Sequence, residues 1–182
     1  DSALLRKSDL LEAALKIRLQ DGRVVFGAVE VNSYFSSVLV DFIRHDLVRR
    51  KVSFTFETVM SAHAKVEFFC LAREQGFRTY LYYVATEDPE INVSRVAHRV
   101  SMGKHDVPKE KIVERYHRSL DYLADAVMCS DRAYVFDNST AERVWVAEIT
   151  DGADLEMKTD SMPYWFKTAL LDKLAADEPG QE

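Results

Sequence analysis

The stretch that decides the fold is Gly76-Phe-Arg-Thr-Tyr-Leu-Tyr-Tyr-Val-Ala-Thr86. Residues Thr79 to Ala85 within it form a near-continuous apolar run, which is typical of a strand covered on both faces. A helical pattern from Ser61 to Gln75 precedes it and ends at Gly76, the usual residue just after a helix. A second helical pattern runs from Asp88-Pro89 to Met102. A strand between two helices indicates an α/β sheet.

The rest of the chain continues this alternation. Helical spacing is also present over Ser8–Asp21, Ser33–Arg50, Pro108–Met128 and Pro163–Ala176. Further strands are expected over Arg23–Phe26, Ser53–Glu57, Ala133–Phe136 and, at a sheet edge, Arg143–Ile149. We therefore predict one α/β domain over residues 1–182, with a three-layer, mostly parallel sheet flanked by helices.

Composition limits the classes of function. The chain has 24 Lys and Arg against 30 Asp and Glu, a net charge of −6, which argues against nucleic acid as a partner. No apolar run approaches the roughly 20 residues of a membrane span. Cys70 and Cys129 have no metal-ligand spacing, and we expect two reduced core cysteines in a cytoplasmic protein. No His, Cys, Asp and Glu set predicts a metal site.

Polar residues at the ends of the expected strands are the first candidate site, because α/β sheets bind ligands at the carboxyl ends of their strands. These residues are Glu57-Thr58, Thr86-Glu87 and Asp137-Asn138. Glu57 and Thr58, with Ser61, could hold a substrate that carries hydroxyl groups. The alternative is that Thr58 or Ser61 simply caps the following helix.

A basic segment is the second candidate. Arg95 and Arg99 are four residues apart and share one helix face, and Arg115 and Arg118 lie on the next helix. A loop containing Lys104 and His105 joins the two helices. Guanidinium groups gathered near one point would match phosphate charge. The alternative is a solvated face with surface ion pairs to Glu110, Glu114 and Asp121, which contribute little stability.

Four segments together resemble the zeta-toxin-like group of P-loop kinases, also described as predicted ABC-type ATPases. They are SFTFET (53–58), GFRTYLYYVAT (76–86), INVSRVAHRVSMGKHDVPKEKIVERYHRSL (91–120) and DRAYVFDNS (131–139). The third segment is the most specific, because it is a long ordered pattern. The resemblance covers about half of the chain.

The resemblance implies a cytoplasmic kinase that uses ATP and Mg²⁺ to phosphorylate a hydroxyl of a small molecule, which in zeta toxins proper is a nucleotide sugar. Glu57 and Thr58 match the residues that contact the acceptor. Residues 91–128 match a helical lid over the phosphates, in which Arg95 and Arg99 would be the catalytic arginines. His105 matches the lid-loop histidine, and Arg115 lies in the helix beyond, so both would bind phosphate.

One departure from the family is large. A P-loop needs Gly-x-x-x-x-Gly-Lys-Ser/Thr, and Gly103-Lys104 is the only Gly-Lys pair in the sequence. Because the sequence begins at Asp1, we expect a preceding segment to carry the P-loop strand, the P-loop and the base, and residues 1–182 alone to be inactive. The alternative is a catalytically inactive relative that acts as a binding module, with an antitoxin protein or a second copy as its partner.

Overall fold

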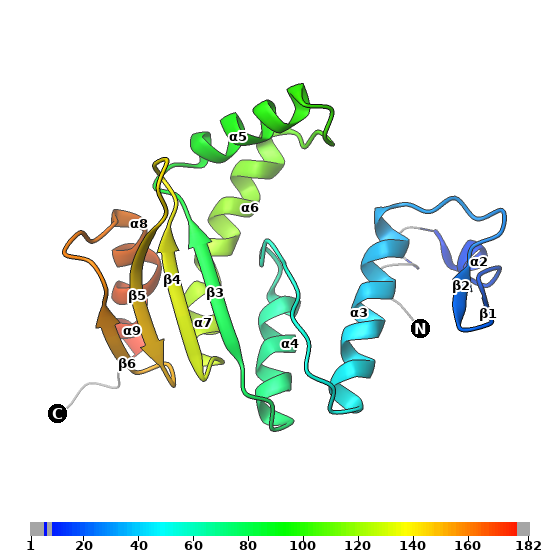
Figure 1. The fold of residues 1–182 in the computed structure, drawn as a ribbon, viewed down its shortest axis with the longest axis horizontal. Coiled ribbons are helices and arrows are strands. Elements are labelled where there is room, and N and C mark those ends of the chain that lie inside the picture. Colours follow the sequence, from blue (N-terminus) through cyan, green and yellow to red (C-terminus); the bar gives the residue numbers. More distant parts are fainter. Residues whose placement is uncertain (1–5, 7–8, 178–182) are drawn as a thin grey trace. The chain divides into compact units, whose positions relative to one another are not determined.

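The computed structural model describes residues 6 and 9–177, and they form two compact units, Asp1–Thr55 and Phe56–Glu182 (Figure 1). The sequence analysis expected one domain. Each unit is described here by itself.

In its described residues, the first unit shows a helical turn, a β-hairpin and one long helix. Its elements are α2 (Leu11–Ala14), β1 (Arg18–Gln20), β2 (Arg23–Val25) and α3 (Ser33–Arg49). Asp21 and Gly22 both have positive φ, as a tight hairpin turn between β1 and β2 requires. The expected Ser8–Asp21 helix is therefore wrong over 15–21, and Ser8 itself lies outside the described residues. The predicted helix from Ser33 is confirmed, with the Asn32 side chain accepting hydrogen bonds at its N-terminus.

The second unit contains a four-stranded mixed sheet in the order β3-β4-β5-β6. The strands are β3 (Tyr80–Ala85), β4 (Arg132–Asp137), β5 (Val144–Thr150) and β6 (Asp154–Met157). Only β3 and β4 are parallel, and the other two pairings are antiparallel. The α/β class is confirmed, but the sheet is not mostly parallel. The placement of β5 at an edge is also wrong, because β6 pairs with its outer side.

Helices of the second unit include α4 (His63–Glu74), α5 (Pro89–Ser101), α6 (Lys109–Asp121) and α7 (Leu123–Met128). The C-terminal segment is α8 (Tyr164–Phe166), the π-helical turn η1 (Lys167–Leu171) and α9 (Asp172–Asp177). The Asp88 side chain caps α5 and Pro89 occupies its first turn, as predicted. The expected long helix from Pro108 is divided at Tyr122 into α6 and α7.

The core lies against one face of the sheet. Ala133 and Val135 of β4 and Val146 of β5 are fully buried there, together with Leu123 of α7 and Phe166 of α8. Figure 1 shows α7 and α9 behind the sheet, whose other face is open in this view. The described residues of this unit therefore show two layers, and the three-layer kinase-like arrangement stays a prediction.

A disulfide between Cys70 of α4 and Cys129, just after α7, joins two helices of the second unit. The backbone at Cys129 is also held by Thr79, whose hydroxyl donates a hydrogen bond to the Cys129 carbonyl (3.0 Å). The expectation of two reduced cysteines is therefore wrong for this structure. The sequence shows no sign of the disulfide, because the two cysteines are 59 residues apart and only the fold brings them together. Within the described residues, no helix is long and apolar enough to cross a membrane.

Candidate functional site at the strand ends

The carboxyl ends of β3 and β4 meet, as the sequence predicts for a parallel pair. Ala85 lies opposite Asp137 in the register, and the Asn138 backbone N–H donates to the Ala85 carbonyl (2.8 Å). Thr86-Glu87 and Asp137-Asn138 are therefore neighbours. Two of the three strand-end segments expected to form a site are brought together.

The Asp137 carboxylate, at the end of β4, is buried, with 9% of the residue exposed. It accepts hydrogen bonds from the Ser139 backbone N–H (2.9 Å), the Ser139 hydroxyl (2.8 Å) and the Trp165 indole N–H (2.7 Å). The Ser139 hydroxyl in turn accepts from the Glu87 backbone N–H (2.7 Å). Three donors compensate the burial of this charge, so Asp137 fixes the two strand ends to each other and to α8.

Arg95 of α5 binds the loop that follows β4, next to Asp137. Its guanidinium donates to the carbonyl oxygens of Asn138 (2.7 Å) and Thr140 (3.3 Å), in the loop that follows β4. The side chain therefore has a structural partner, which the sequence analysis did not expect for a proposed catalytic arginine. A phosphate group at this point would compete with these carbonyls for the guanidinium.

Asn92 of α5 and Tyr116 of α6 complete the cluster. Asn92 donates to the Thr86 hydroxyl (2.8 Å), and the Tyr116 hydroxyl donates to the Thr86 carbonyl (2.8 Å). Burial, together with the carboxylates of Glu87, Asp88 and Asp137, raises the pKa of Tyr116 to about 12. Tyr116 is therefore a protonated hydrogen-bond donor at neutral pH.

We call Thr86, Asn92, Arg95, Tyr116, Asp137 and Ser139 the strand-end cluster. Sequence reasoning did not single out Asn92, Tyr116 or Ser139 as site residues. One signal was available, because Asn92, Arg95 and Arg99 recur at a spacing of three and four residues and so share one face of α5.

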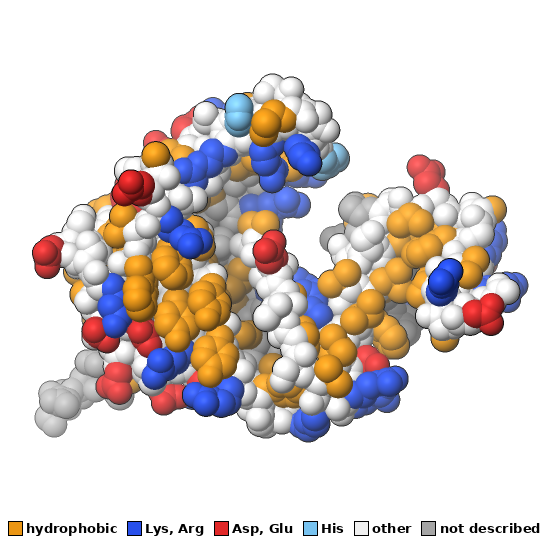
Figure 2. Space-filling view, viewed as in Figure 1, with side chains coloured by type: hydrophobic (Ala, Val, Ile, Leu, Met, Phe, Trp, Pro, Cys, Tyr) orange, Lys and Arg blue, Asp and Glu red, His pale blue; other side chains and the backbone are white. Residues whose placement is uncertain are grey.

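The other predicted phosphate-binding residues lie further along the two helices and their loop. Arg99, His105 and Arg115 are exposed, and no hydrogen bond or ion pair to any other residue in the described part of the chain engages their side chains. Helices α5 and α6 and the loop between them form a helical hairpin, and we call these three the hairpin basic residues. Figure 2 shows Lys and Arg side chains gathered along the α5 and α6 region. Among the described residues, no side-chain hydrogen bond or ion pair joins these three to the strand-end cluster.

The proposed acceptor-binding residues lie in an extended segment before α4. Ser53–Glu57 forms no strand in the described residues, so that prediction is wrong. Glu57 is exposed, and the Thr58 hydroxyl accepts a hydrogen bond from the Met60 backbone N–H (3.1 Å). The N-cap of α4 is Ala62 and no side chain caps the helix, so the alternative role of Thr58 or Ser61 as a cap is also wrong.

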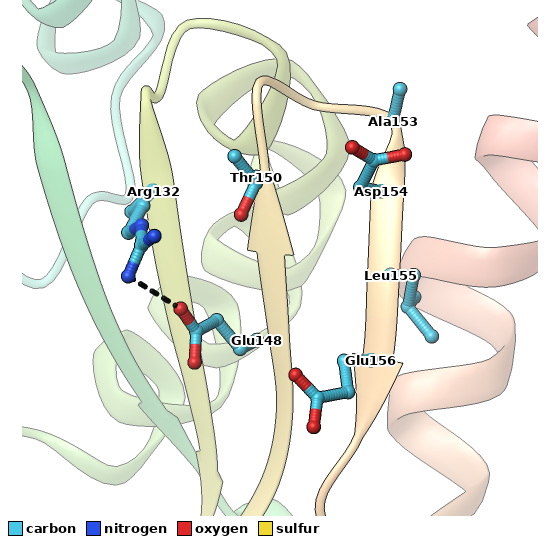
Figure 3. A pocket seen from close by; sticks show the side chains of 7 residues that line it. All are labelled: Arg132, Glu148, Thr150, Ala153, Asp154, Leu155 and Glu156. Atoms are coloured by element: carbon cyan, nitrogen blue, oxygen red, sulfur yellow. Dashed lines mark ion pairs between the residues drawn. The ribbon is translucent and has the colours of Figure 1, made fainter.

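A shallow pocket of 360 Å³ lies elsewhere, at the other end of the sheet. It is lined by Arg132, Glu148, Thr150, Ala153, Asp154, Leu155 and Glu156 (Figure 3). Arg132 begins β4 and Asp137 ends it, so the pocket and the strand-end cluster are about 16 Å apart along the strand. The pocket is no part of the candidate site.

Comparisons with known proteins add little to this geometry. No family model and no solved structure matches the chain. A curated relative is an uncharacterized protein of Haemophilus influenzae, 28% identical over 72 residues, which are 40% of this chain and 51% of the relative. The matched region thus spans about half the length of that relative. The fold is α/β in class. Membership of the zeta-toxin-like family is still a prediction from the sequence resemblance.

Proposed function

We propose that the chain belongs to an ATP-dependent phosphotransferase that moves the γ-phosphoryl group onto a hydroxyl of a small molecule, as its zeta-toxin-like segments imply. One observation supports the proposal most directly. The α5–α6 hairpin stands over the carboxyl ends of a parallel strand pair, and it carries three unengaged basic residues, Arg99, His105 and Arg115. Phosphoryl transfer depends chiefly on positioning and on cations around the phosphate oxygens.

The residues present fit only part of an ATP site. The sequence has no P-loop, and the described residues include no group of three His, Cys, Asp or Glu that could hold a metal ion. ATP and Mg²⁺ are therefore proposed cofactors, and no reaction step is derived through them. What this chain supplies in the proposal is charge neutralisation by Arg99 and Arg115, and acceptor contacts by Glu57, Thr58 and Ser61.

Arg95 changes role within this proposal. Because its guanidinium is bonded to two loop carbonyls, Arg95 acts as a positioning residue that holds the hairpin to the strand ends. Arg99, one helical turn further along the same face, becomes the main candidate for direct phosphate contact. A cytoplasmic location belongs to the same proposal, and because disulfides rarely persist there, the Cys70–Cys129 pair would then be reduced in cells.

The experiment is an assay of ADP formation by the natural gene product with ATP, Mg²⁺ and a panel of nucleotide sugars. We expect acceptor-dependent ADP release from that product and none from residues 1–182 alone. A folded natural product that releases no ADP above background with any hydroxyl acceptor would contradict the proposal.

A second candidate function is an inactive relative that acts as a binding module, with an antitoxin protein as its partner. The occupied guanidinium of Arg95 and the missing P-loop favour it. Nucleic acid and membranes are partners in neither proposal. Calorimetric titration of the natural gene product with ATP and Mg²⁺ separates the two functions, because a binding module of this kind should show no heat.

A further inference from the structure

The face of the sheet turned away from the core is aromatic and exposed. Strand alternation directs Tyr80, Tyr82 and Val84 of β3 to this face, and their exposed fractions are 43%, 66% and 47%. Tyr134 and Phe136 of β4 lie on the same face. Figure 2 shows the hydrophobic side chains gathered over the strands, with charged groups around them. We call this surface the open face.

The aromatic rings on the open face form two stacked pairs. The ring centroids of Tyr82 and Tyr134 are 4.8 Å apart, and those of Phe136 and Trp145 are 6.3 Å apart. Lys158 lies over the Trp145 ring (4.9 Å to the centroid), and Arg143 lies over the Phe136 ring (5.0 Å). A continuous exposed patch of this kind on a protein surface marks an interaction site.

Charge on the open face is divided between its two halves. The register aligns Tyr80, Arg132, Thr150 and Asp154 in one row and Tyr82, Tyr134, Glu148 and Glu156 in the next. The three carboxylates in these rows, Glu148, Asp154 and Glu156, all belong to β5 or β6, as Figure 3 shows. Phenol groups and Arg132 occupy the β3 and β4 half, with Arg78 lying over the Tyr80 ring (5.7 Å). The carboxylate half also carries a cation, Lys158, which pairs with Glu148 (3.6 Å) and Glu156 (2.6 Å), and Arg132 also pairs with Glu148 (3.0 Å). Three carboxylates against this lysine leave the half negative.

This division makes the open face complementary to itself. A twofold axis parallel to the strands would place β3 of one copy over β6 of the other and β4 over β5. Tyr80 would then lie opposite Asp154 of the second copy, Tyr82 opposite Glu156 and Tyr134 opposite Glu148. The half that carries Arg78 and Arg132 then meets the half whose three carboxylates outnumber Lys158, and each pair occurs twice, as an isologous interface requires.

We propose that a second copy of this chain covers the open face through this twofold arrangement. Phe136 and Trp145, neighbours in the register, would stack on Trp145 and Phe136 of the second copy at the upper end of the strands. Arg78, above Tyr80, would approach Asp154 of the second copy, and Asp154 has no ion pair within the described residues. Face-to-face packing of two sheets, which this dimer would contain, is a common arrangement in proteins.

Charge argues against other occupants. A single-stranded nucleic acid stacked on the aromatic rings would carry its phosphates past Asp154, Glu148 and Glu156, in a chain of net charge −6. Arg132 and Lys158 neutralise the Glu148 and Glu156 carboxylates only in part. A membrane surface would meet the same carboxylates. The second copy uses both the donor half and the carboxylate half.

Sedimentation equilibrium of the 182-residue protein tests the proposal. We expect twice the 20.9 kDa mass of one chain at micromolar concentration. Tyr82→Glu, which would place a carboxylate opposite Glu156, should weaken the dimer at least tenfold. Met102→Glu, at an exposed position at the end of α5, is the matched control and should leave the mass unchanged.

A charge exchange tests the orientation. Arg78→Glu alone and Asp154→Arg alone should each weaken the dimer, because each would oppose like charges across the twofold axis. The double variant Arg78→Glu/Asp154→Arg should recover most of the wild-type dimer constant. A monomeric wild-type protein, a dimer unaffected by Tyr82→Glu, or a double variant no better than the single ones would overturn the proposal. Circular dichroism confirms that each variant is folded, and none of these results depends on ATP.

Discussion

The strand-end cluster and the hairpin basic residues both contain arginine side chains, but these side chains are hydrogen-bonded in the cluster and have no such partner on the hairpin, in the part of the chain that the structure describes. In the cluster, Arg95 donates to two carbonyls and the Asp137 carboxylate accepts three hydrogen bonds. On the hairpin, Arg99 is exposed and has no such partner among the described residues. Two arginines four residues apart on one helix face are therefore in different settings: Arg95 holds the fold, and Arg99 is the one that we propose to meet a ligand.

The largest effect is expected at Arg99. If the natural gene product is a kinase, Arg99→Ala should lower kcat by about 10³, as loss of an arginine that stabilises transferring phosphate does. The melting temperature should change little, because the side chain is exposed and makes no hydrogen bond or ion pair in the described residues. Lys111→Ala, on the exposed side of α6, is the matched control. An unchanged kcat would remove Arg99 from the mechanism.

The disulfide should have the next largest effect, because the segment it encloses contains both the hairpin and β3. Closing a loop of 59 residues stabilises a folded chain by about 4 kcal/mol through the entropy of the unfolded state. We expect a reductant to lower the free energy of unfolding, measured with urea, by an amount of this order. The double variant Cys70→Ser/Cys129→Ser should be insensitive to reductant. Equal stability of the wild-type protein in both conditions would show that no disulfide forms.

Arg95 should affect stability rather than ligand affinity. Arg95→Gln removes its hydrogen bonds to Asn138 and Thr140, so the free energy of unfolding should fall by about 1 kcal/mol. Arg99→Gln, at the matched position on the next turn, should change it by less than about 0.5 kcal/mol. Urea unfolding of the two variants measures the difference directly. Equal losses would show that the two regions are not distinct.

The smallest effect is a change with pH at Tyr116. The folded pKa is raised from the ordinary value near 10 to about 12, first by burial and then by the nearby carboxylates of Glu87, Asp88 and Asp137. The neutral phenol is therefore favoured in the folded state. Its contribution to stability is complete below pH 10 and is lost as the pH rises to about 12. Tyr116→Phe should remove this part of the pH dependence, which thermal unfolding of both proteins between about pH 9 and 12 would show.

Local signals predicted much of the fold. The apolar run of Thr79–Ala85 predicted β3, although the expectation of a strand covered on both faces is wrong, because one face of β3 is exposed. Asp88-Pro89 predicted the start of α5, and Gly76 marked the end of α4. The meeting of the β3 and β4 ends also followed, because parallel strands end at one edge. These features depend on residues close together in sequence or on a general rule of sheets.

Features that depend on distant partners could not be predicted. The partners of Arg95 lie 43 and 45 residues away in sequence, and Cys129 lies 59 residues from Cys70. The interior position of β5 depends on β6, a four-residue strand with little apolar pattern. Ser53–Glu57 has the composition of a strand but pairs with no strand in the described residues, and composition alone does not supply a partner.

One titration tests most directly whether the hairpin basic residues, and not the strand-end cluster, meet an anionic ligand. The natural gene product and its Arg99→Gln variant are titrated with ATP and Mg²⁺ by calorimetry. We predict saturable binding by the wild-type protein and an affinity at least tenfold lower in the variant. No binding heat from the folded wild-type protein, or the same affinity in both proteins, would contradict the account.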